Sequence, residues 1–180
     1  MIAIMSGNFE RLFAGATLRD FAAGEALFRA GDAVVSMILL RTGHAELVRH
    51  TGHGLRMILQ RAGPGQVLAE ASAWSDVYHC DAVACGTCTA AVLPRRVFRI
   101  RLKSAPDLAD TWAKNLAQAV QAARLRAEIR SLPRVADRLG AWLAEGNRLP
   151  DKGRWQKVAA ELGVTREALY RELSRRRRAG

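Results

Sequence analysis

Near the C-terminal end of the chain, in residues 155–178, apolar residues recur at helical spacing on both sides of a short turn. Gly163 stands at the turn, where a positive φ is often needed, and Thr165 is suited to cap the second helix. Ala159 is small, as is required where two helices cross closely. This pattern predicts a helix-turn-helix, which lays its second helix in the major groove of DNA, although an ordinary helical hairpin would share it. The residues expected to face one core are Val158, Leu162, Val164, Leu169 and Leu173.

The N-terminal part shows a different pattern, in which short apolar segments are separated by glycine-containing turns. A short helix is expected at residues 8–14. Gly24 and Gly31 then flank Leu27 and Phe28, which indicates short strands joined by turns. Many short strands at regular spacing predict an antiparallel barrel or sandwich. Further strands are expected at 34–40, 45–50, 55–60, 67–68, 82–84 and 89–93, with turns at 42–43, 52–54, 63–65 and 85–88.

A long helix is expected between Pro106, which can open it, and Pro133, which closes it. Its alanine-rich apolar stripe is thin, which is typical of a parallel two-stranded coiled coil; a helix packed on its own domain is the alternative. A second amphipathic helix is expected at residues 134–145. The predicted dimer-interface residues are Leu108, Trp112, Leu116, Ala119, Val120, Ala123 and Ile129.

Charge changes the picture because it is unevenly distributed along the chain. The formal net charge is +11 at pH 7. From Arg124 onward the sequence has 15 Lys and Arg against 7 Asp and Glu, whereas the residues before it have 13 and 10. A basic C-terminal third favours binding to a polyanion such as DNA. No stretch there forms a basic amphipathic helix that is free to lie on a membrane.

The sequence predicts a cytoplasmic protein without a membrane partner. No apolar run approaches the ~18 residues needed to span a bilayer. The N-terminus has neither the basic segment nor the apolar core of a signal peptide. The 3 cysteines lie close together and do not form the pattern of a secreted disulfide framework.

The N-terminal part also carries a series of specific residues. It contains Gly24-Glu25-x-Leu27-Phe28-x-x-Gly31-Asp32, then a strand–Gly43–strand unit, then Gly65 and Ala69-Glu70. This series resembles the cyclic-nucleotide-binding β-roll of the CRP/FNR family of bacterial transcription regulators. With the helix-turn-helix, the resemblance covers nearly the whole chain.

The resemblance implies an α+β fold in three parts. These are an N-terminal antiparallel β-roll, double-stranded and jelly-roll-like, at residues 1–105, a long dimerisation helix at 106–132, and a helix-turn-helix DNA-binding domain at 133–180. It also implies a homodimer that reads an inverted-repeat operator in double-stranded DNA and contacts RNA polymerase.

Family members that bind cyclic AMP hold it with a Gly-Glu pair and, ten residues later, an Arg-Ser pair that binds the phosphate. Glu70 matches, but Ala69 replaces the glycine, Cys80 the arginine and Asp81 the serine. These exchanges are expected to weaken cyclic AMP binding by about several hundred-fold. On an ungapped match, the polar pair that reads adenine is also lost, to Ala119-Val120. We therefore expect another effector, in a pocket formed by Glu70, Ala71, Ser72, Cys80 and Asp81.

The cysteines suggest one hypothesis for the cofactor, which the sequence does not identify. Cys85 and Cys88 flank a Gly-Thr turn, close enough for a disulfide or a shared soft metal. With His79 and Cys80 they could form a site for zinc, copper(I) or an iron–sulfur cluster. Strand alternation argues against it, because Cys85 would point outward if Cys80 points inward. The alternative is that the cysteines are small core residues. The cluster cysteines of FNR-type members lie in an N-terminal extension without a counterpart in this sequence.

The recognition helix of the family carries Arg-Glu and an arginine four residues after the glutamate, and Arg166, Glu167 and Arg171 match this pattern. Arginine donates bidentately to guanine and glutamate accepts from cytosine, so a TGTGA-like half-site is expected. Tyr170 departs from the family and is expected to alter one base; Glu172 stands where the family has an apolar residue. The other predicted DNA contacts are Thr165, Lys157, Arg175, Arg176, Arg177 and Arg178, with Lys152 and Arg154.

Family members continue past the recognition helix into a two-stranded wing, whereas this sequence ends at Gly180. Either the sequence is cut short, or the protein binds DNA without a wing and relies on its arginine run. The alternative function is a dimeric ligand- or metal-binding sensor module that acts through protein contacts, without specific DNA binding.

An enzyme is not expected. Cys85 and Cys88 have the spacing of a dithiol oxidoreductase, but they lie in a hairpin turn instead of at a helix N-terminus, where a thiol pKa would be lowered. The sequence contains no Gly-rich phosphate loop, no Ser/His/Asp set and no zincin motif.

Overall fold

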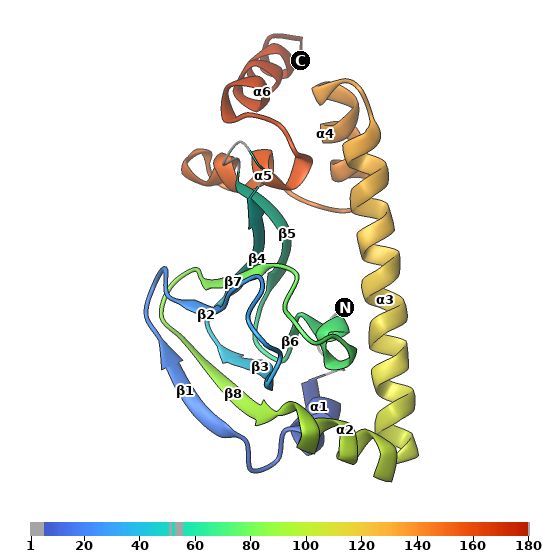
Figure 1. Cartoon of the computed structure of the whole chain (residues 1–180). Helices are drawn as coiled ribbons and strands as arrows, with labels where there is room; N and C mark the ends of the chain where they lie inside the picture. Colours follow the sequence, from blue (N-terminus) through green and yellow to red (C-terminus); the bar gives the residue numbers. More distant parts are fainter. Residues whose placement is uncertain (1–5, 51, 53–55, 180) are drawn as a thin grey trace. The chain divides into compact units, whose positions relative to one another are not determined.

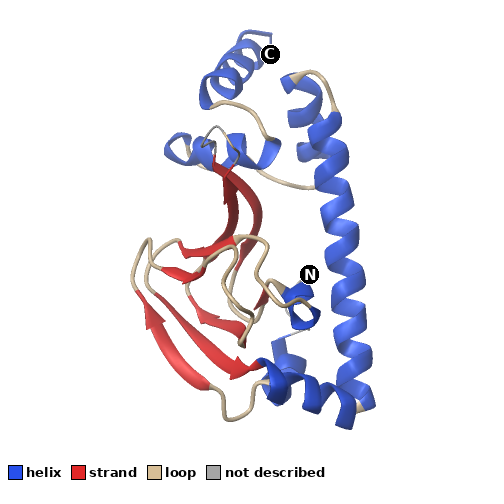
Figure 2. Cartoon of the chain, in the orientation of Figure 1, coloured by secondary structure: helices blue, strands red, loops and turns tan. Residues whose placement is uncertain are grey.

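The computed structural model describes residues 6–50, 52 and 56–179 of the chain. The described residues form two sheets followed by a series of helices (Figures 1 and 2), as the predicted α+β fold requires. The predicted turn at residues 52–54 and the start of the strand predicted at 55 lie mostly outside the described residues. None of the described helices combines the length and the apolarity needed to cross a membrane.

Two four-stranded antiparallel sheets make up the N-terminal roll. Their strand orders are β1-β8-β3-β6 and β2-β7-β4-β5, so each sheet pairs strands that are far apart in sequence. Alanines such as Ala82, Ala84, Ala90 and Ala91 are almost fully buried, and their small side chains allow neighbouring layers to approach the strands closely. The strands are β1 (Thr17–Phe21), β2 (Ala26–Phe28), β3 (Ser36–Thr42), β4 (Ala45–His50), β5 (Arg56–Ala62), β6 (Val67–Leu68), β7 (Asp81–Ala84) and β8 (Cys88–Pro94).

The predicted strands are confirmed, with one notable shift at β3. The prediction began this strand at Val34, whereas it begins at Ser36 and continues to Thr42. Val34 is buried, but its N–H donates to the Asp76 carbonyl oxygen in a loop instead of to the sheet. The apolar character of Val34 predicts its burial but does not show whether it is buried in a strand or in a loop.

Gly43 makes the tight turn between β3 and β4 possible. Its φ is +73°, and an added Cβ would lie 2.5 Å from the Thr87 carbonyl oxygen and 2.6 Å from the Cys88 Cβ. Both the left-handed backbone and the lack of space therefore require glycine at this position.

Gly43→Ala is expected to lower the free energy of unfolding by about 2–4 kcal/mol, because strain at positive φ adds to overpacking. Urea unfolding measures this change. The control is Gly24→Ala, where φ is +80° and nothing lies within 4 Å of the added Cβ. Strain alone should cost about 1–2 kcal/mol there. Equal losses in the two variants would contradict the steric argument.

Helices flank the sheets in the sequence. Two are short: α1 (Ser6–Leu12) and α2 (Arg95–Ser104). Helix α2 was not predicted from the sequence, since its buried Phe98 and Leu102 are one helical turn apart among five cationic residues. The long predicted helix is confirmed as α3 (Pro106–Ser131). The remaining helices are α4 (Val135–Ala144), α5 (Trp155–Leu162) and α6 (Arg166–Ala179), with single 3-10 turns η1 (Glu70–Trp74) and η2 (Lys152–Arg154).

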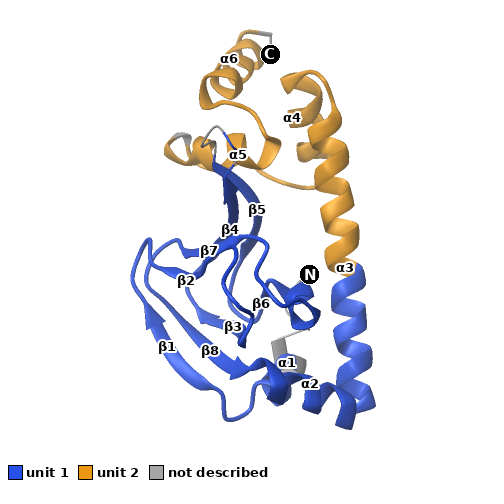
Figure 3. Cartoon of the chain, in the orientation of Figure 1, with its two compact units in different colours: residues 1–117 blue, residues 118–180 orange. Residues whose placement is uncertain are grey.

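The chain divides into two compact units, residues 1–117 and 118–180 (Figure 3). The division falls within α3, whereas the sequence analysis expected boundaries at residues 105 and 132, which are the ends of this helix. The second half of α3 therefore belongs to the same unit as α4, α5 and α6.

Each unit has its own hydrophobic core. The core of the first unit is built from both sheets, α1, α2 and the start of α3. The core of the second unit contains four of the five predicted residues as buried side chains, and the fifth, Val164, is partly buried against them. The buried residues of the second core are Ile129, Leu139, Val158, Ala159, Leu162, Leu169 and Leu173.

Candidate nucleic-acid interface and effector site

Helices α5 and α6 form the predicted helix-turn-helix. Gly163 ends α5 with φ 65° and ψ 40°, the left-handed conformation that a tight helix end requires. The Thr165 hydroxyl accepts a hydrogen bond from the Ala168 N–H at 3.2 Å, so Thr165 caps α6 as predicted. Leu169 and Leu173 are buried, and these contacts fix which face of α6 points away from the core.

The outward face of α6 carries the predicted base-reading residues. Arg166, Glu167 and Arg171 are exposed, and Tyr170 is half-buried. The Tyr170 ring meets the Trp155 ring edge-on at 4.9 Å, and the Arg166 guanidinium lies 5.1 Å from the centre of the Tyr170 ring. Tyr170 therefore connects the start of α5 to the first turn of α6, and it positions Arg166.

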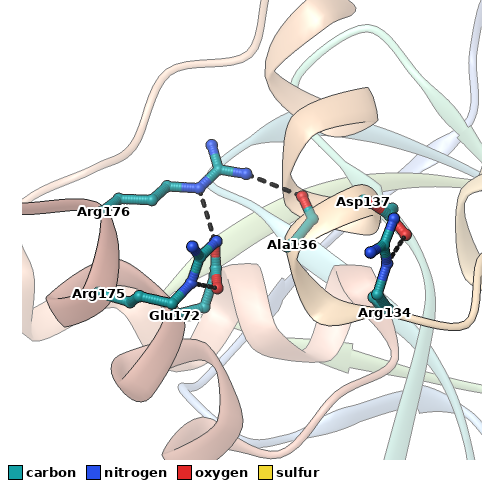
Figure 4. Close-up of polar contacts among 6 residues, drawn as sticks. All are labelled: Arg134, Ala136, Asp137, Glu172, Arg175 and Arg176. Carbon is teal, nitrogen blue, oxygen red and sulfur yellow. Dashed lines mark hydrogen bonds and ion pairs between the residues drawn. The ribbon is translucent and has the colours of Figure 1, made fainter. Parts of the chain in front are cut away.

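The four consecutive arginines of α6 have different surroundings. Arg175 donates twice to the Glu172 carboxylate, at 2.9 Å each (Figure 4). Arg176 donates to the same carboxylate at 2.8 Å and to the Ala136 carbonyl oxygen of α4 at 2.8 Å (Figure 4). The Arg177 guanidinium lies over the Trp155 ring at 5.3 Å. Arg178 is exposed and has no such internal contact among the described residues.

Glu172 explains why two of these arginines are engaged. Its side chain is 8% exposed, and it lies where an apolar residue was expected. The structural role of Glu172 could not be predicted from the sequence, because its partner Arg176 reaches α4, which is distant in the sequence. The hydrogen bonds from Arg175 and Arg176 lower the pKa of Glu172 to about 2.

Glu172→Gln is expected to lower the free energy of unfolding at pH 7 by about 1–3 kcal/mol, because charged hydrogen bonds become neutral ones. A carboxylate with a lowered pKa stabilises the fold above its unfolded pKa. In the wild type this stability should therefore disappear as the pH falls from about 4.5 to about 2. Urea unfolding at pH 7 and pH 3 measures both effects. Glu167→Gln, on the exposed face of the same helix, is the control and should change neither.

Two shallow grooves border the outward face of α6. One is lined by side chains of α6 alone, and the other lies between α6 and the start of α4. Arg171 and Arg175 line both grooves, and Arg134 and Arg178 line one each. Cationic grooves beside an exposed helix face are suited to the phosphates that flank a base-reading helix. Lys157 and Arg154 are exposed on and before α5, whereas the side chain of Lys152 is outside the described set.

The residues of the predicted effector pocket lie on η1 and at the start of β7. Glu70 and Ala71 begin η1, Ser72 is buried within it, and Cys80 is buried just before β7. The Asp81 carboxylate accepts a hydrogen bond from the Ala30 N–H at 2.8 Å. It also lies 3.7 Å from His50 Nδ1.

Ala69, directly before η1, has φ 47° and ψ 52°. Among the described residues it is the one non-glycine residue with a positive φ. The glycine expected at this position would adopt that conformation without strain, which costs alanine about 1–2 kcal/mol. The backbone at this position is thus one that favours glycine, although the residue is alanine.

The four residues of the hypothetical thiolate site are not brought together. Cys80 and Cys88 are buried, whereas Cys85 and His79 are exposed, as the strand alternation predicts for Cys80 and Cys85. Within the described part of the chain, no three His, Cys, Asp or Glu side chains form a group that could hold a metal ion. Burial raises the pKa of Cys80 and of Cys88, which disfavours the thiolate that a metal or an oxidant needs.

The predicted dimer residues of α3 divide into two groups. Leu108 and Trp112 are buried in the core of the first unit, and Ile129 is buried in the core of the second. The structure thus corrects the prediction for these three, because the chain itself covers their side chains. Leu116 and Ala119 are half-buried, and Val120 and Ala123 are exposed. These four remain as candidates for an interface.

Comparison with known proteins agrees with this arrangement. Residues 18–104 match the model of the cyclic nucleotide-binding domain family. The c-di-GMP-responsive global regulator CLP of Xanthomonas campestris aligns at 19% identity over 97% of this chain and 93% of its own, with a TM-score of 0.78. FixK2 of Bradyrhizobium japonicum aligns at 18% identity over 89% and 83%, with a TM-score of 0.73. The chain has the fold of the CRP/FNR transcription regulators.

Another CRP-family regulator, from Thermus thermophilus, aligns at 18% identity over 90% of this chain and 85% of its own, with a TM-score of 0.69. A search of curated protein sequences found no match. The matched domain, residues 18–104, contains all of α2 and both sheets except Thr17, the first residue of β1. The resemblance to the CRP/FNR family is thus confirmed by the whole fold, beyond the short motifs that first indicated it.

In the cassette of this CRP/FNR-type fold, the side chains that replace the expected phosphate-binding pair carry no positive charge. The two positions that bind the phosphate in cyclic-AMP-binding members hold the buried Cys80 thiol and the Asp81 carboxylate. The guanidinium of Arg49, on β4, is directed to the His79 carbonyl oxygen, to which it donates at 3.2 and 2.8 Å. Asp81 would repel a phosphate, and neither Asp81 nor Cys80 supplies a compensating cation.

Proposed function

We propose that this chain is a DNA-binding transcription regulator of the CRP/FNR type. In this proposal it works as a homodimer on an inverted-repeat operator and responds to an effector other than cyclic AMP. The observation that carries the proposal is the exposed trio Arg166, Glu167 and Arg171, on a helix whose other face is buried. These side chains are suited to read guanine and cytosine edges in a major groove. The solved structures with this fold are described as transcription regulators, which supports the same function.

Selection from a library of inverted repeats, followed by fluorescence anisotropy titration, tests the proposal. We expect the selected operator to bind at least about 10³-fold more tightly than scrambled DNA. The logarithm of the affinity should fall with the logarithm of salt concentration, by about 0.9 for each phosphate contacted. Binding that depends on salt but not on sequence would overturn the operator proposal. No binding at all would favour a dimeric sensor module that acts through protein contacts.

The proposed weakness of cyclic AMP binding depends in part on Cys80 and Asp81, so changing these two side chains should restore part of the affinity. Cys80→Arg combined with Asp81→Ser is expected to raise the affinity for cyclic AMP by about tenfold, because one charged phosphate contact is restored. Isothermal titration calorimetry of wild type and variant measures the change. Cys88→Ser, at the other buried cysteine, is the control. Tight binding of cyclic AMP by the wild type would contradict the argument.

Sensing through the cysteines remains a hypothesis for the effector. Elemental analysis and thiol titration of protein purified without oxygen test it directly. Bound metal, or a loss of DNA binding on oxidation, would support it. Three free thiols, no bound metal and unchanged DNA binding in a variant with serine at Cys80, Cys85 and Cys88 would exclude it.

A further inference from the structure

The C-terminal end of α5 is covered by two arginines from the helices that precede it. The last carbonyl oxygens of a helix lack partners within the helix and carry the negative end of its dipole. Arg130, in the last turn of α3, donates from Nε to the Glu161 carbonyl oxygen at 2.9 Å and from Nη2 to that of Ala160 at 3.4 Å. Its Cγ would lie 3.5 Å from a Cβ added to Gly163, so its stem packs against the turn.

Arg138, in α4, completes the cover. Its Nη1 donates to the carbonyl oxygens of Leu162 and Gly163 at 3.2 and 3.1 Å. Its Nε donates to the Leu132 carbonyl oxygen, in the link between α3 and α4, at 2.6 Å. Two guanidinium groups thus bind four successive carbonyl oxygens, at the point where the chain turns toward α6.

The two arginines place positive charge next to the negative end of the α5 dipole, which is favourable. Burying part of that charge has an energetic cost. Arg130 is partly buried, and burial together with the charges of Arg126 and Arg138 lowers its pKa. An arginine stays charged under these conditions, so it needs strong acceptors. The unpaired carbonyl oxygens of a helix end supply them. Apolar side chains could cover the turn but could not satisfy these oxygens.

We propose that Arg130 and Arg138 are positioning residues of the DNA reader. Together they fix the turn between α5 and α6 to the end of α3, so that a movement of α3 reaches α6 without a hinge at residues 131–133. The division of the chain supports this, because the second half of α3 from Gln118 onward belongs to the same compact unit as α6. The inference rests on the proposed function, since it concerns how that DNA reader is oriented.

The test compares Arg130→Lys, Arg138→Lys and the double variant with the wild type, in the full chain. Lysine keeps the charge but loses the fork that binds two oxygens. Arg124→Lys, the same exchange at an exposed position of α3, is the control. Anisotropy titrations, carried out well below the melting temperature, measure the affinity for the selected operator and for scrambled DNA. A loss of affinity for the operator alone indicates that α6 is wrongly oriented. Hydrogen exchange of the amides of residues 164–168 measures mobility of the turn.

We expect the double variant to bind the operator about tenfold more weakly, with unchanged binding to scrambled DNA and an unchanged salt slope. The turn amides should exchange about tenfold faster, and the control should match the wild type. Operator affinity equal to wild type in a folded double variant, or a smaller salt slope, would overturn the inference. If the wild type itself binds no operator, the proposed function fails. Hydrogen exchange then still decides whether the two arginines hold the turn.

Discussion

Replacing Val120 with glutamate is expected to convert the proposed dimer to a monomer. Operator binding should weaken by about 10²–10⁴-fold, because a dimer gains its second half-site contact as an intramolecular event. Val120 is 48% exposed, which is unusual for a large apolar side chain in the middle of a long helix. A buried, unpaired carboxylate in the same position would cost several times the energy of one apolar contact.

The positions around Val120 show why this residue is the sharpest probe of the interface. Apolar residues follow one another at alternating intervals of three and four along α3, which is the spacing of a two-stranded coiled coil. The side chains of this stripe are not part of the buried cores of the two units. The half-buried Leu116 is the exception, because it packs against the core of the first unit. The stripe consists of Ala113, Leu116, Val120, Ala123 and Ala127.

Gln118→Glu is the matched control for Val120→Glu. It adds the same charge to the same helix, but on the opposite face, about 160° away at 100° per residue. Analytical ultracentrifugation gives the oligomeric state, and anisotropy gives the operator affinity. A Val120→Glu variant that remains a dimer would show that the protein pairs through another surface. A monomeric wild type with full operator affinity would contradict the need for pairing.

The sequence was sufficient where a local residue determines the local structure. Gly163 and Thr165 each act within a few residues of their own position, so the helix-turn-helix could be predicted together with its cap. The strands of the roll were predictable for the same reason, since turns such as Gly43 separate them. The opposite environments of the buried Cys80 and the exposed Cys85 agree with the strand alternation read from the sequence.

The sequence was insufficient where a side chain depends on a distant partner. An apolar stripe on α3 does not say which surface covers it, so Leu108 and Ile129 were assigned to a dimer although the chain's own cores bury them. The arginine run looked uniform, yet the carboxylate of Glu172 and the Ala136 carbonyl oxygen engage Arg176. Such contacts join helices that only the packing of the second unit brings together.

The same distinction between engaged and available arginines leads to a prediction for base reading. Arg171 is exposed, lines both grooves, and has no hydrogen bond or ion pair with another described residue. It is therefore the arginine of α6 best placed to donate bidentately to a guanine. By contrast, Arg175 would have to leave the Glu172 carboxylate before it could reach DNA.

Arg171→Ala is expected to cost about 1–3 kcal/mol at each half-site, and a dimer has two. Operator affinity should therefore fall by about 30-fold to 10⁴-fold, whereas binding to scrambled DNA should change little. The variant should also become indifferent to the identity of one base pair in each half-site. Anisotropy titrations with the operator and with its single-base substitutions measure both effects.

Arg178→Ala is the control, since it removes an exposed arginine from the same helix at a position suited to phosphate binding. Its affinity should fall equally on operator and scrambled DNA, and the salt slope should decrease by about 0.9 for each phosphate that the variant no longer neutralises. If Arg171→Ala also lost affinity equally for operator and scrambled DNA, Arg171 would contact the DNA backbone and not a base. Base reading would then have to depend on Arg166 and Glu167, the other two exposed polar residues of the proposed trio.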